Sequence, residues 1–420
     1  MRLTNEELNK IKKDNNVDTL WSWSRLEKAR ISLYEFYLAY IKHVPEDRTD
    51  CVYGVMGGLC HDILEKLYNN ELSYDEMGTN FESNWAVAID ISDLKFDRND
   101  SEKNRSIGAK YKENLTHFFE HHKVIPYKVA TERFVLTKFT DEIIFQGYID
   151  GVFKDNNGCY NIIDFKTSTK YSPSVQKEKC GQLVCYALGL NQMGVPLDKI
   201  NIAWNFLKYV RVLYKQANGT WKNREIERRE IGKSLVAPVK VWLKKLGYED
   251  DINRYIDEMV LNNSIESLPD DVKEMFIFDD CYVGVDLTQD LIDYWTGIVV
   301  NTVNNINDKI KKYDVEVLTN PNEADKIFYD TQEAIEKESY YYATLSGYSA
   351  NLNKPYKIYL EKLEQKKNGI ISYDGLGSEL DDDELEEIVK DTKIVENSTE
   401  DNVDSVSDND DIDLSWLDEV

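Results

Sequence analysis

Two carboxylates and an ammonium fall on the polar faces of two neighbouring predicted strands. Residues 143–153 and 159–166 alternate polar and apolar side chains, and a period of two puts Asp164 and Lys166 on one face. Antiparallel pairing brings Asp150 of the preceding strand near both. Such a cluster is costly unless it binds something, and Mg²⁺ binds one or two carboxylates while keeping several waters. The alternative is an exposed sheet face with an ordinary surface salt bridge.

Two helices flank these strands and carry polar pairs at helical spacing. Gln182 and Tyr186 lie four residues apart on the helix that follows, and His61 and Glu65 lie four apart on a helix far upstream. Residues at this spacing share one face of a helix. The bland alternatives are a satisfied core histidine at 61 and a plain core tyrosine at 186.

The order of these motifs resembles the PD-(D/E)XK nuclease superfamily, specifically its RecB-like branch. GGLCHDILEKLY, GYID, DFK and QLVCY match the branch's histidine helix, G-x-x-D strand, D-x-K strand and Q-x-x-x-Y helix. The opening WSWSRLEKARISLYEFYLAYI is similar to the family's Ser-rich helix start. The resemblance spans residues 21–210, about half of the chain, and implies a restriction-endonuclease-like α/β core.

The resemblance implies a divalent metal site that uses Mg²⁺ or Mn²⁺. Asp150 and Asp164 would be metal-binding carboxylates, with the backbone carbonyl of Phe165 as an additional ligand. His61 would complete the metal shell through a neutral imidazole nitrogen. A divalent cation at a phosphodiester screens charge and lowers the pKa of bound water.

The remaining motif residues would act on the substrate or support the ligands. Lys166 would orient or activate the attacking water and stabilise charge on the phosphate. Gln182 and Tyr186 would line the groove and position the DNA backbone. Glu132 matches a glutamate often seen in the preceding strand of the family, and Glu65 is assigned to a supporting or structural role.

Cysteine placement argues against the iron–sulfur cluster that many RecB-like relatives carry. The six cysteines are scattered without a CxxC pair, none lies between Ala29 and Ser32, and none lies between Tyr340 and Tyr359. Scattered thiols instead fit a reduced, cytoplasmic protein. No run approaches the length of a membrane span, and the chain has no helicase motor.

Periodicity predicts helices first, then strands, then helices. Helices are expected at 19–43, 55–68, 106–122 and 174–193, and strands at 127–139, 143–153, 159–166 and 199–208. The fold class is therefore α/β, a mixed central sheet flanked by helices. We assign residues 1–245 to the nuclease core with its N-terminal helices, 246–373 to a mainly helical region on or beside it, and 374–420 to a disordered acidic tail.

The net charge of −26 is unevenly distributed. Residues 374–420 hold 19 acids against Lys390 and Lys393, so the tail carries −17 and the rest of the chain −9. Composition excludes a globally basic nucleic-acid binder, but not an enzyme with a local basic groove. The tail ends in acids around isolated apolar residues, which suits a docking motif for a replication or recombination protein, a DNA mimic, or a merely solubilising segment.

One basic segment is the candidate DNA groove. Residues 208–245 hold 11 Lys and Arg against three Glu, a net of +8, with aromatic residues interleaved. A solvated hairpin with core aromatics is the alternative. The expected DNA-binding residues are Lys208, Arg211, Lys215, Trp221, Lys222, Arg224, Arg228 and Arg229.

The resemblance to the RecB-like branch implies a Mg²⁺- or Mn²⁺-dependent deoxyribonuclease, an exonuclease of recombination, repair or replication. The abundance of Asn, Lys and Tyr suits a phage or low-GC bacterial protein, which would act in the host cytoplasm. The second hypothesis is a DNA-end-binding or recombination scaffold that keeps the nuclease fold but cleaves little.

Overall fold

The computed structural model describes most of the chain. The described residues are 2–46, 52–96, 101–338, 341–342, 346–348, 361–362 and 365. The acidic segment 374–420 lies outside them, so its disorder stays a prediction.

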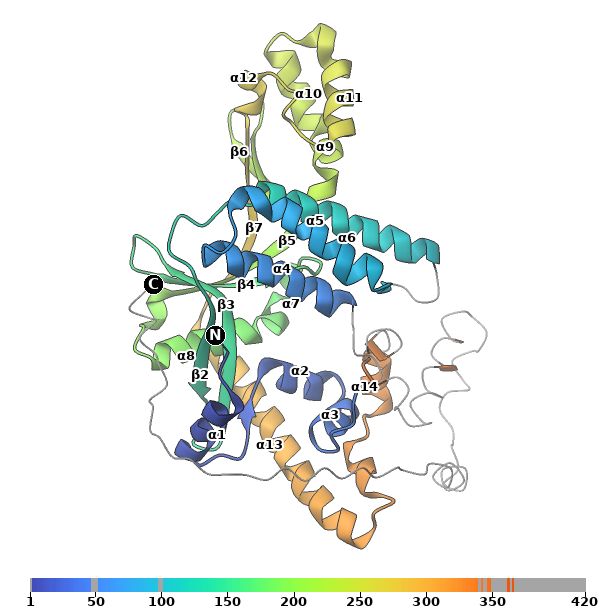
Figure 1. Cartoon of the computed structure of the whole chain (residues 1–420). Helices are drawn as coiled ribbons and strands as arrows, with labels where there is room; N and C mark the ends of the chain where they lie inside the picture. The colour runs from blue at the N-terminus through green and yellow to red at the C-terminus, as the bar shows by residue number, and fades with distance from the viewer. Residues whose placement is uncertain are drawn as a thin grey trace.

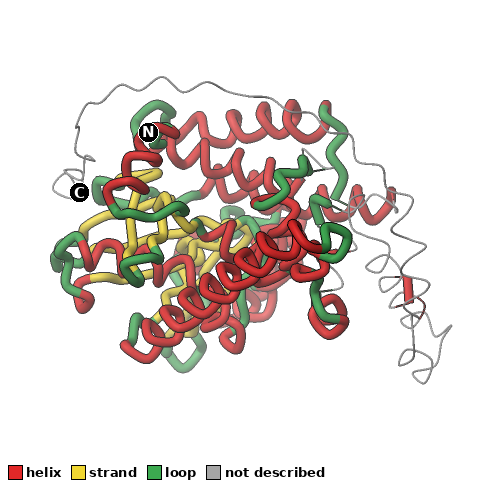
Figure 2. The backbone as a smooth tube through the Cα atoms, turned by 90° about the horizontal axis from the view of Figure 1, so that it is seen from below, coloured by secondary structure: helices red, strands yellow, loops and turns green. Residues whose placement is uncertain are grey.

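A mixed sheet forms the centre of the molecule, as predicted, and it has seven strands where four were expected (Figure 2). Strand β3 is flanked by β2 and, at opposite ends of its other edge, by β1 and β4; β5 follows β4 and also pairs with β6 and β7. The β1–β3 and β4–β5 pairs are parallel and the others antiparallel. The strands are β1 (Leu20–Trp21), β2 (Ala130–Lys138), β3 (Ile144–Lys154), β4 (Tyr160–Lys166), β5 (Ile200–Lys215), β6 (Trp221–Glu227) and β7 (Phe276–Val285).

Strands β3 and β4 form a fork. They pair only over Gly151–Lys154 and Tyr160–Ile163, after which β4 continues beside β5 and β3 continues beside β2. The next pair in this register would be Asp150 opposite Asp164. The two carboxylates therefore lie where the ladder between these strands opens.

Helices cover both faces of the sheet, and each layer has its own apolar core. One face packs against α2 (Trp23–Ile31), α8 (Gly181–Gln192) and α13 (Gln289–Thr319). The other packs against α4 (Val52–Tyr68), α5 (Met77–Trp85) and α6 (Ser101–His121), which lie together across the upper half of Figure 1. Peripheral helices are α1 (Asn5–Asp14), α3 (Leu33–Tyr40), α7 (Pro173–Lys179) and α14 (Gln332–Lys337).

A lobe projects from the sheet at the top of Figure 1. The outer ends of β5, β6 and β7 pack there against four short helices around a separate apolar cluster. These helices are α9 (Ile231–Ser234), α10 (Val236–Lys245), α11 (Ile252–Asn262) and α12 (Asp270–Lys273). Strand β7, from the region predicted to be mainly helical, crosses the lobe and enters the central sheet beside β5.

Candidate active site

Asp150 lies at the fork, where its side chain takes the place of a ladder hydrogen bond. Its Oδ2 accepts a hydrogen bond from the backbone N–H of Phe165 at 2.9 Å. Only 10% of the Asp150 side chain is exposed. Burial, with the nearby charge of Asp164, raises the pKa of Asp150 to about 6, against the opposing effect of His61. A buried carboxylate of this kind is stabilised by a cation.

His61 reaches the fork from α4. Its Nε2 lies 2.9 Å from the carbonyl oxygen of Phe165, and its Nδ1 lies 3.7 Å from Oδ2 of Asp150. The first distance fits a hydrogen bond from Nε2–H to the carbonyl, which leaves the Nδ1 lone pair facing the carboxylate. The second distance is too long for a hydrogen bond but is one that two ligands of a single cation can have.

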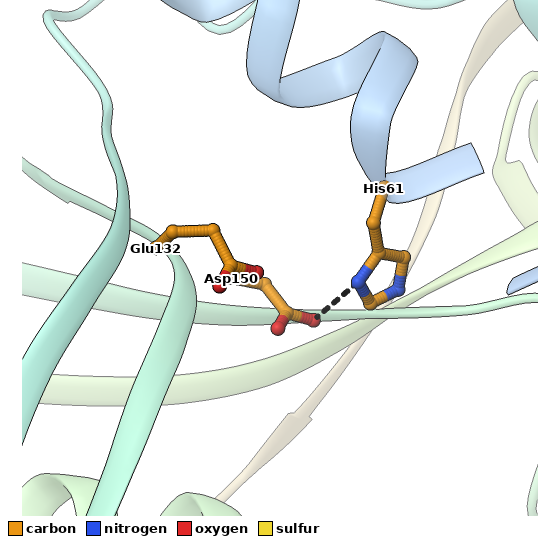
Figure 3. Close-up of side chains that lie close together, drawn as sticks. All are labelled: His61, Glu132 and Asp150. Carbon is orange, nitrogen blue, oxygen red and sulfur yellow. Dashed lines mark ion pairs between the residues drawn. The ribbon is translucent and has the colours of Figure 1, made fainter. Parts of the chain in front are cut away.

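Glu132 of β2 completes this group, as Figure 3 shows. Glu132 stands opposite Asp150 in the β2–β3 register, between the paired residues Thr131 and Arg133. Its φ of 47° lies in the left-handed region, which is costly for a residue with a Cβ. One ligand atom from each of His61, Glu132 and Asp150 lies within 4.8 Å of the others. The sequence predicted only a supporting role for Glu132, because the alternation of side chains along a strand does not reveal a single residue in the left-handed conformation.

The donor set fits a hard divalent cation. Two carboxylates and an imidazole nitrogen converge on one point, and oxygen-rich sites of this kind suit Mg²⁺ and Mn²⁺. The carbonyl of Phe165 instead contacts Nε2, the ring nitrogen of His61 on the other side from Asp150, so its expected role as an additional ligand stays a prediction. Among the described residues, this is the group of His, Cys, Asp and Glu side chains that could hold a metal ion.

Asp164 and Lys166 form an ion pair on the next strand. Lys166 Nζ lies 2.6 Å from Oδ2 of Asp164, and Asp164 is 1% exposed. Burial disfavours the ammonium, but the charges of Asp164 and Asp150 outweigh it and raise the pKa of Lys166. Lys166 is therefore held as a cation beside the metal group. Asp164 lies outside that group of three, so its expected role as a metal ligand stays a prediction.

A family comparison agrees with this geometry. The model of the PD-(D/E)XK nuclease superfamily matches residues 20–308, which include every motif residue discussed so far. The chain belongs to the PD-(D/E)XK nuclease superfamily. No curated protein matches it. Within the described residues, no helix has the length and hydropathy to cross a membrane.

The helix of this nuclease that carries Gln182, α8, contacts Lys166 through a hydrogen bond. Gln182 Oε1 accepts a hydrogen bond from Lys166 Nζ at 3.4 Å, and Gln182 Nε2 donates to the Tyr186 hydroxyl at 2.9 Å. A Cβ on Gly147 would lie 2.4 Å from Cε1 of Tyr186. The glycine of the G-x-x-D strand is thus explained, because the tyrosine ring packs directly on its backbone. Tyr186 is buried and also part of the core.

Glu65 stands one turn after His61 and faces the same side of the site. It lines a cavity of about 300 Å³ together with His61 and Glu132. Burial and the neighbouring charge of Glu132 raise its pKa. The structure thus places Glu65 beside the metal group, and its supporting role stays a prediction.

The structure divides the basic segment into an interior part and a surface part. Arg228 is 1% exposed and bonds Asp280 through Nη2 at 2.5 Å. Lys208 is also buried, and its ammonium stands 4.2 Å from the centre of the Tyr111 ring. In these positions, Arg228 and Lys208 contribute to the interior of the protein. Arg211 and Arg229 are half-buried, and they pair with Glu225 and Glu227, respectively. The residues nearer the surface of the β5–β6 ribbon are Lys215, Trp221, Lys222 and Arg224.

Proposed function

We propose that the chain is a Mg²⁺- or Mn²⁺-dependent DNA exonuclease of the RecB-like branch, acting in recombination, repair or replication. The observation that carries the proposal is the fork, where a metal-binding group and a buried Asp–Lys pair meet. The Asn, Lys and Tyr content suits a phage or low-GC bacterial source and action in the cytoplasm.

The residues of the fork divide the work of phosphodiester hydrolysis. His61, Glu132 and Asp150 would hold the cation, which supplies Lewis-acid activation of water and of the phosphate. Lys166, kept protonated by Asp164, donates a hydrogen bond to a phosphate oxygen and offsets the charge that develops there. Gln182 limits the freedom of the ammonium, so that little order is lost when the phosphate arrives.

A metal-dependent cleavage assay with matched variants tests the proposal. Asp164→Asn leaves Lys166 without its counter-charge, and Lys166→Ala removes the ammonium group itself. Each variant should lower kcat by roughly 10²- to 10³-fold, since loss of one preorganised charge costs this much. Asp141→Asn, in the exposed turn between β2 and β3, is the matched control and should cut like the wild type.

End-labelled single- and double-stranded DNA would also report direction and strand preference. A wild-type protein that binds DNA but cuts none with Mg²⁺ or Mn²⁺ refutes the enzyme proposal. The scaffold hypothesis would then take its place.

We further propose that DNA follows the surface part of the basic segment. Trp221 is 46% exposed and its ring offers a stacking surface, with Lys222 and Arg224 on the same strand. The double variant Lys222→Ala with Arg224→Ala should weaken DNA binding and reduce its salt dependence by roughly two charges. Unchanged affinity and slope would place the DNA elsewhere.

The acidic tail is proposed to bind a replication or recombination protein. Deletion of residues 376–420 separates this from competition with DNA, because a DNA mimic slows cleavage at low salt. Faster cleavage by the shortened chain would favour the mimic. An unchanged rate would eliminate the mimic and leave recruitment to be tested by partner binding.

A further inference from the structure

Arg2 and Leu3 form a short segment beside the metal group. It borders the 300 Å³ cavity already described beside His61, which opens next to the metal-binding side chains. The residues that line this cavity are Arg2, Gly58, His61, Asp62, Glu65 and Glu132. Arg2 therefore contributes to the cavity from a part of the chain that carries none of the family motifs.

Three contacts fix the segment there. Nε and Nη2 of Arg2 donate to Oε2 of Glu132 at 3.2 and 3.1 Å. The Arg2 guanidinium stands 5.4 Å from the centre of the Tyr148 ring, and the Leu3 backbone N–H donates to the Tyr148 hydroxyl at 2.8 Å. Because Tyr148 precedes Asp150 by two residues in β3, the same strand positions both Arg2 and the metal group.

The position of Arg2 contributes little to folding. Its side chain is 74% exposed, and an ion pair in this setting is screened by water. A guanidinium has five N–H donors in a planar fork, and the contact with Glu132 uses only one edge of it. The remaining donors are available to a ligand in the cavity.

The charges around the cavity need a cation if an anion is to enter. Three of the residues that line it are acids: Asp62, Glu65 and Glu132. Asp62 is paired with Lys66 at 2.7 Å, whereas Glu65 lies beside Glu132. Among the described residues that line the cavity, Arg2 is the one with a permanent positive charge.

We propose that Arg2 is a substrate-binding residue that takes a DNA phosphate as it approaches the metal group. The proposal rests on the nuclease function proposed above. A carboxylate has two oxygens, so Glu132 can hold Arg2 with one and serve the metal with the other. The Glu132 carboxylate would then lie between the guanidinium and the metal ion. In that position the guanidinium can make bidentate hydrogen bonds to a phosphate that approaches the metal.

The test compares Arg2→Ala and Arg2→Lys for DNA affinity in an Asp164→Asn background, which slows cleavage during the titration. The probes are short duplexes with a 5′-phosphate or a 5′-hydroxyl, titrated with Mg²⁺ present at several salt concentrations. Arg2→Ala should weaken binding roughly 10- to 100-fold, the range of a charge-assisted hydrogen bond. Arg2→Lys should recover only part, since an ammonium lacks the fork. Arg254→Ala, which removes another exposed and ion-paired arginine, is the matched control.

The two probes distinguish the source of the phosphate. A loss confined to the 5′-phosphorylated duplex assigns Arg2 to a terminal phosphate, and an equal loss on both assigns it to an internal one. Unchanged or tighter binding by Arg2→Ala overturns the proposal. So does a loss explained by weaker Mn²⁺ binding without DNA, because Arg2 would then act only through Glu132. If the wild type cuts no DNA, the proposed function fails, yet this binding comparison still decides on Arg2.

Discussion

At the scale of single residues, the metal group contains a conflict between stability and function at Glu132. The residue has a left-handed backbone and places its carboxylate beside that of Asp150. Both features disfavour folding, since the conformation is costly for a residue with a Cβ and like charges repel. Strain of this kind persists when the surrounding structure holds it for a purpose.

Replacing Glu132 by glycine should therefore separate the two properties. Glu132→Gly removes both costs and should raise the free energy of unfolding by up to about 1 kcal/mol. The same change should weaken Mn²⁺ binding at least about 10-fold. Calorimetric titration and urea unfolding measure the two effects. Glu142→Gly, at an exposed residue without positive φ, should only destabilise; equal losses in both variants would contradict the strain argument.

The contact between Gly147 and Tyr186 makes a second prediction at this scale. A methyl group on Gly147 would overlap the tyrosine ring, so Gly147→Ala should cost about 1–3 kcal/mol of stability and displace α8 with Gln182. Adding Tyr186→Ala should return α8 most of the way to its original position, but it should not recover the lost packing. Gly297→Ala, in helix α13 with open space around it, is the control and should be neutral or stabilising; a neutral Gly147→Ala would show that the contact is loose.

At the scale of elements, the motif-bearing segments could be predicted because their periodicity is local. The helix expected at 55–68 is α4 at Val52–Tyr68, and the strands carrying Asp150 and Asp164 agree closely with β3 and β4. The restriction-endonuclease-like mixed sheet is confirmed in the same way. Alternation within the strands thus predicted that Asp150, Asp164 and Lys166 would lie close together, whereas His61 was added by the resemblance to the family.

Breaks within helices were not predictable from spacing. The helix expected at 174–193 is two helices, α7 and α8, which meet where a Cβ on Gly181 would lie 2.5 Å from Trp23 and Trp295. The helix expected at 19–43 likewise divides at Ser32, whose hydroxyl caps α3 and also donates to Oδ2 of Asp330 at 3.1 Å. Both breaks depend on partners distant in sequence, and periodicity within a segment does not contain that information.

Strand β7 was missed for a similar reason. Its sequence FIFDDCYVGV has two adjacent acids, which interrupt the alternation of a half-buried strand. Asp280 is nevertheless buried, because Arg228 and His122 bond its two oxygens. A polar residue reads as exposed until its partners are known. The same pairing turned Arg228, expected in the DNA groove, into an interior residue.

At the scale of the whole molecule, this buried network joins the lobe to helix α4. Asp280 of β7 accepts from Arg228, at the base of the lobe, and lies 2.6 Å from Nδ1 of His122. The other ring nitrogen of His122 lies 2.8 Å from the hydroxyl of Tyr68. Tyr68 is two turns beyond His61 on α4, so the lobe and the metal group share one helix as a common support.

The network makes stability depend on pH in acid. Burial alone would raise the pKa of Asp280, but its bonds to His122 and Arg228 outweigh burial and lower it. A carboxyl with a lowered pKa in the folded state stabilises the fold fully above its unfolded value, about 3.9. That stability is lost as pH falls from about 4 through the lower folded-state value, because protonation then favours the unfolded chain.

Asp280→Asn tests this directly. The change leaves Arg228 buried without its counter-charge and should lower the free energy of unfolding at pH 7 by about 3–5 kcal/mol. It should also flatten the fall in stability below pH 4, measured by urea unfolding at several pH values. Asp270→Asn, with a side chain 93% exposed, should keep both the stability and the acid slope of the wild type. An unchanged slope in Asp280→Asn would assign the acid sensitivity to other carboxylates. If the variant folds, a lower Mn²⁺ affinity than in Asp270→Asn would show that the network positions His61 through α4.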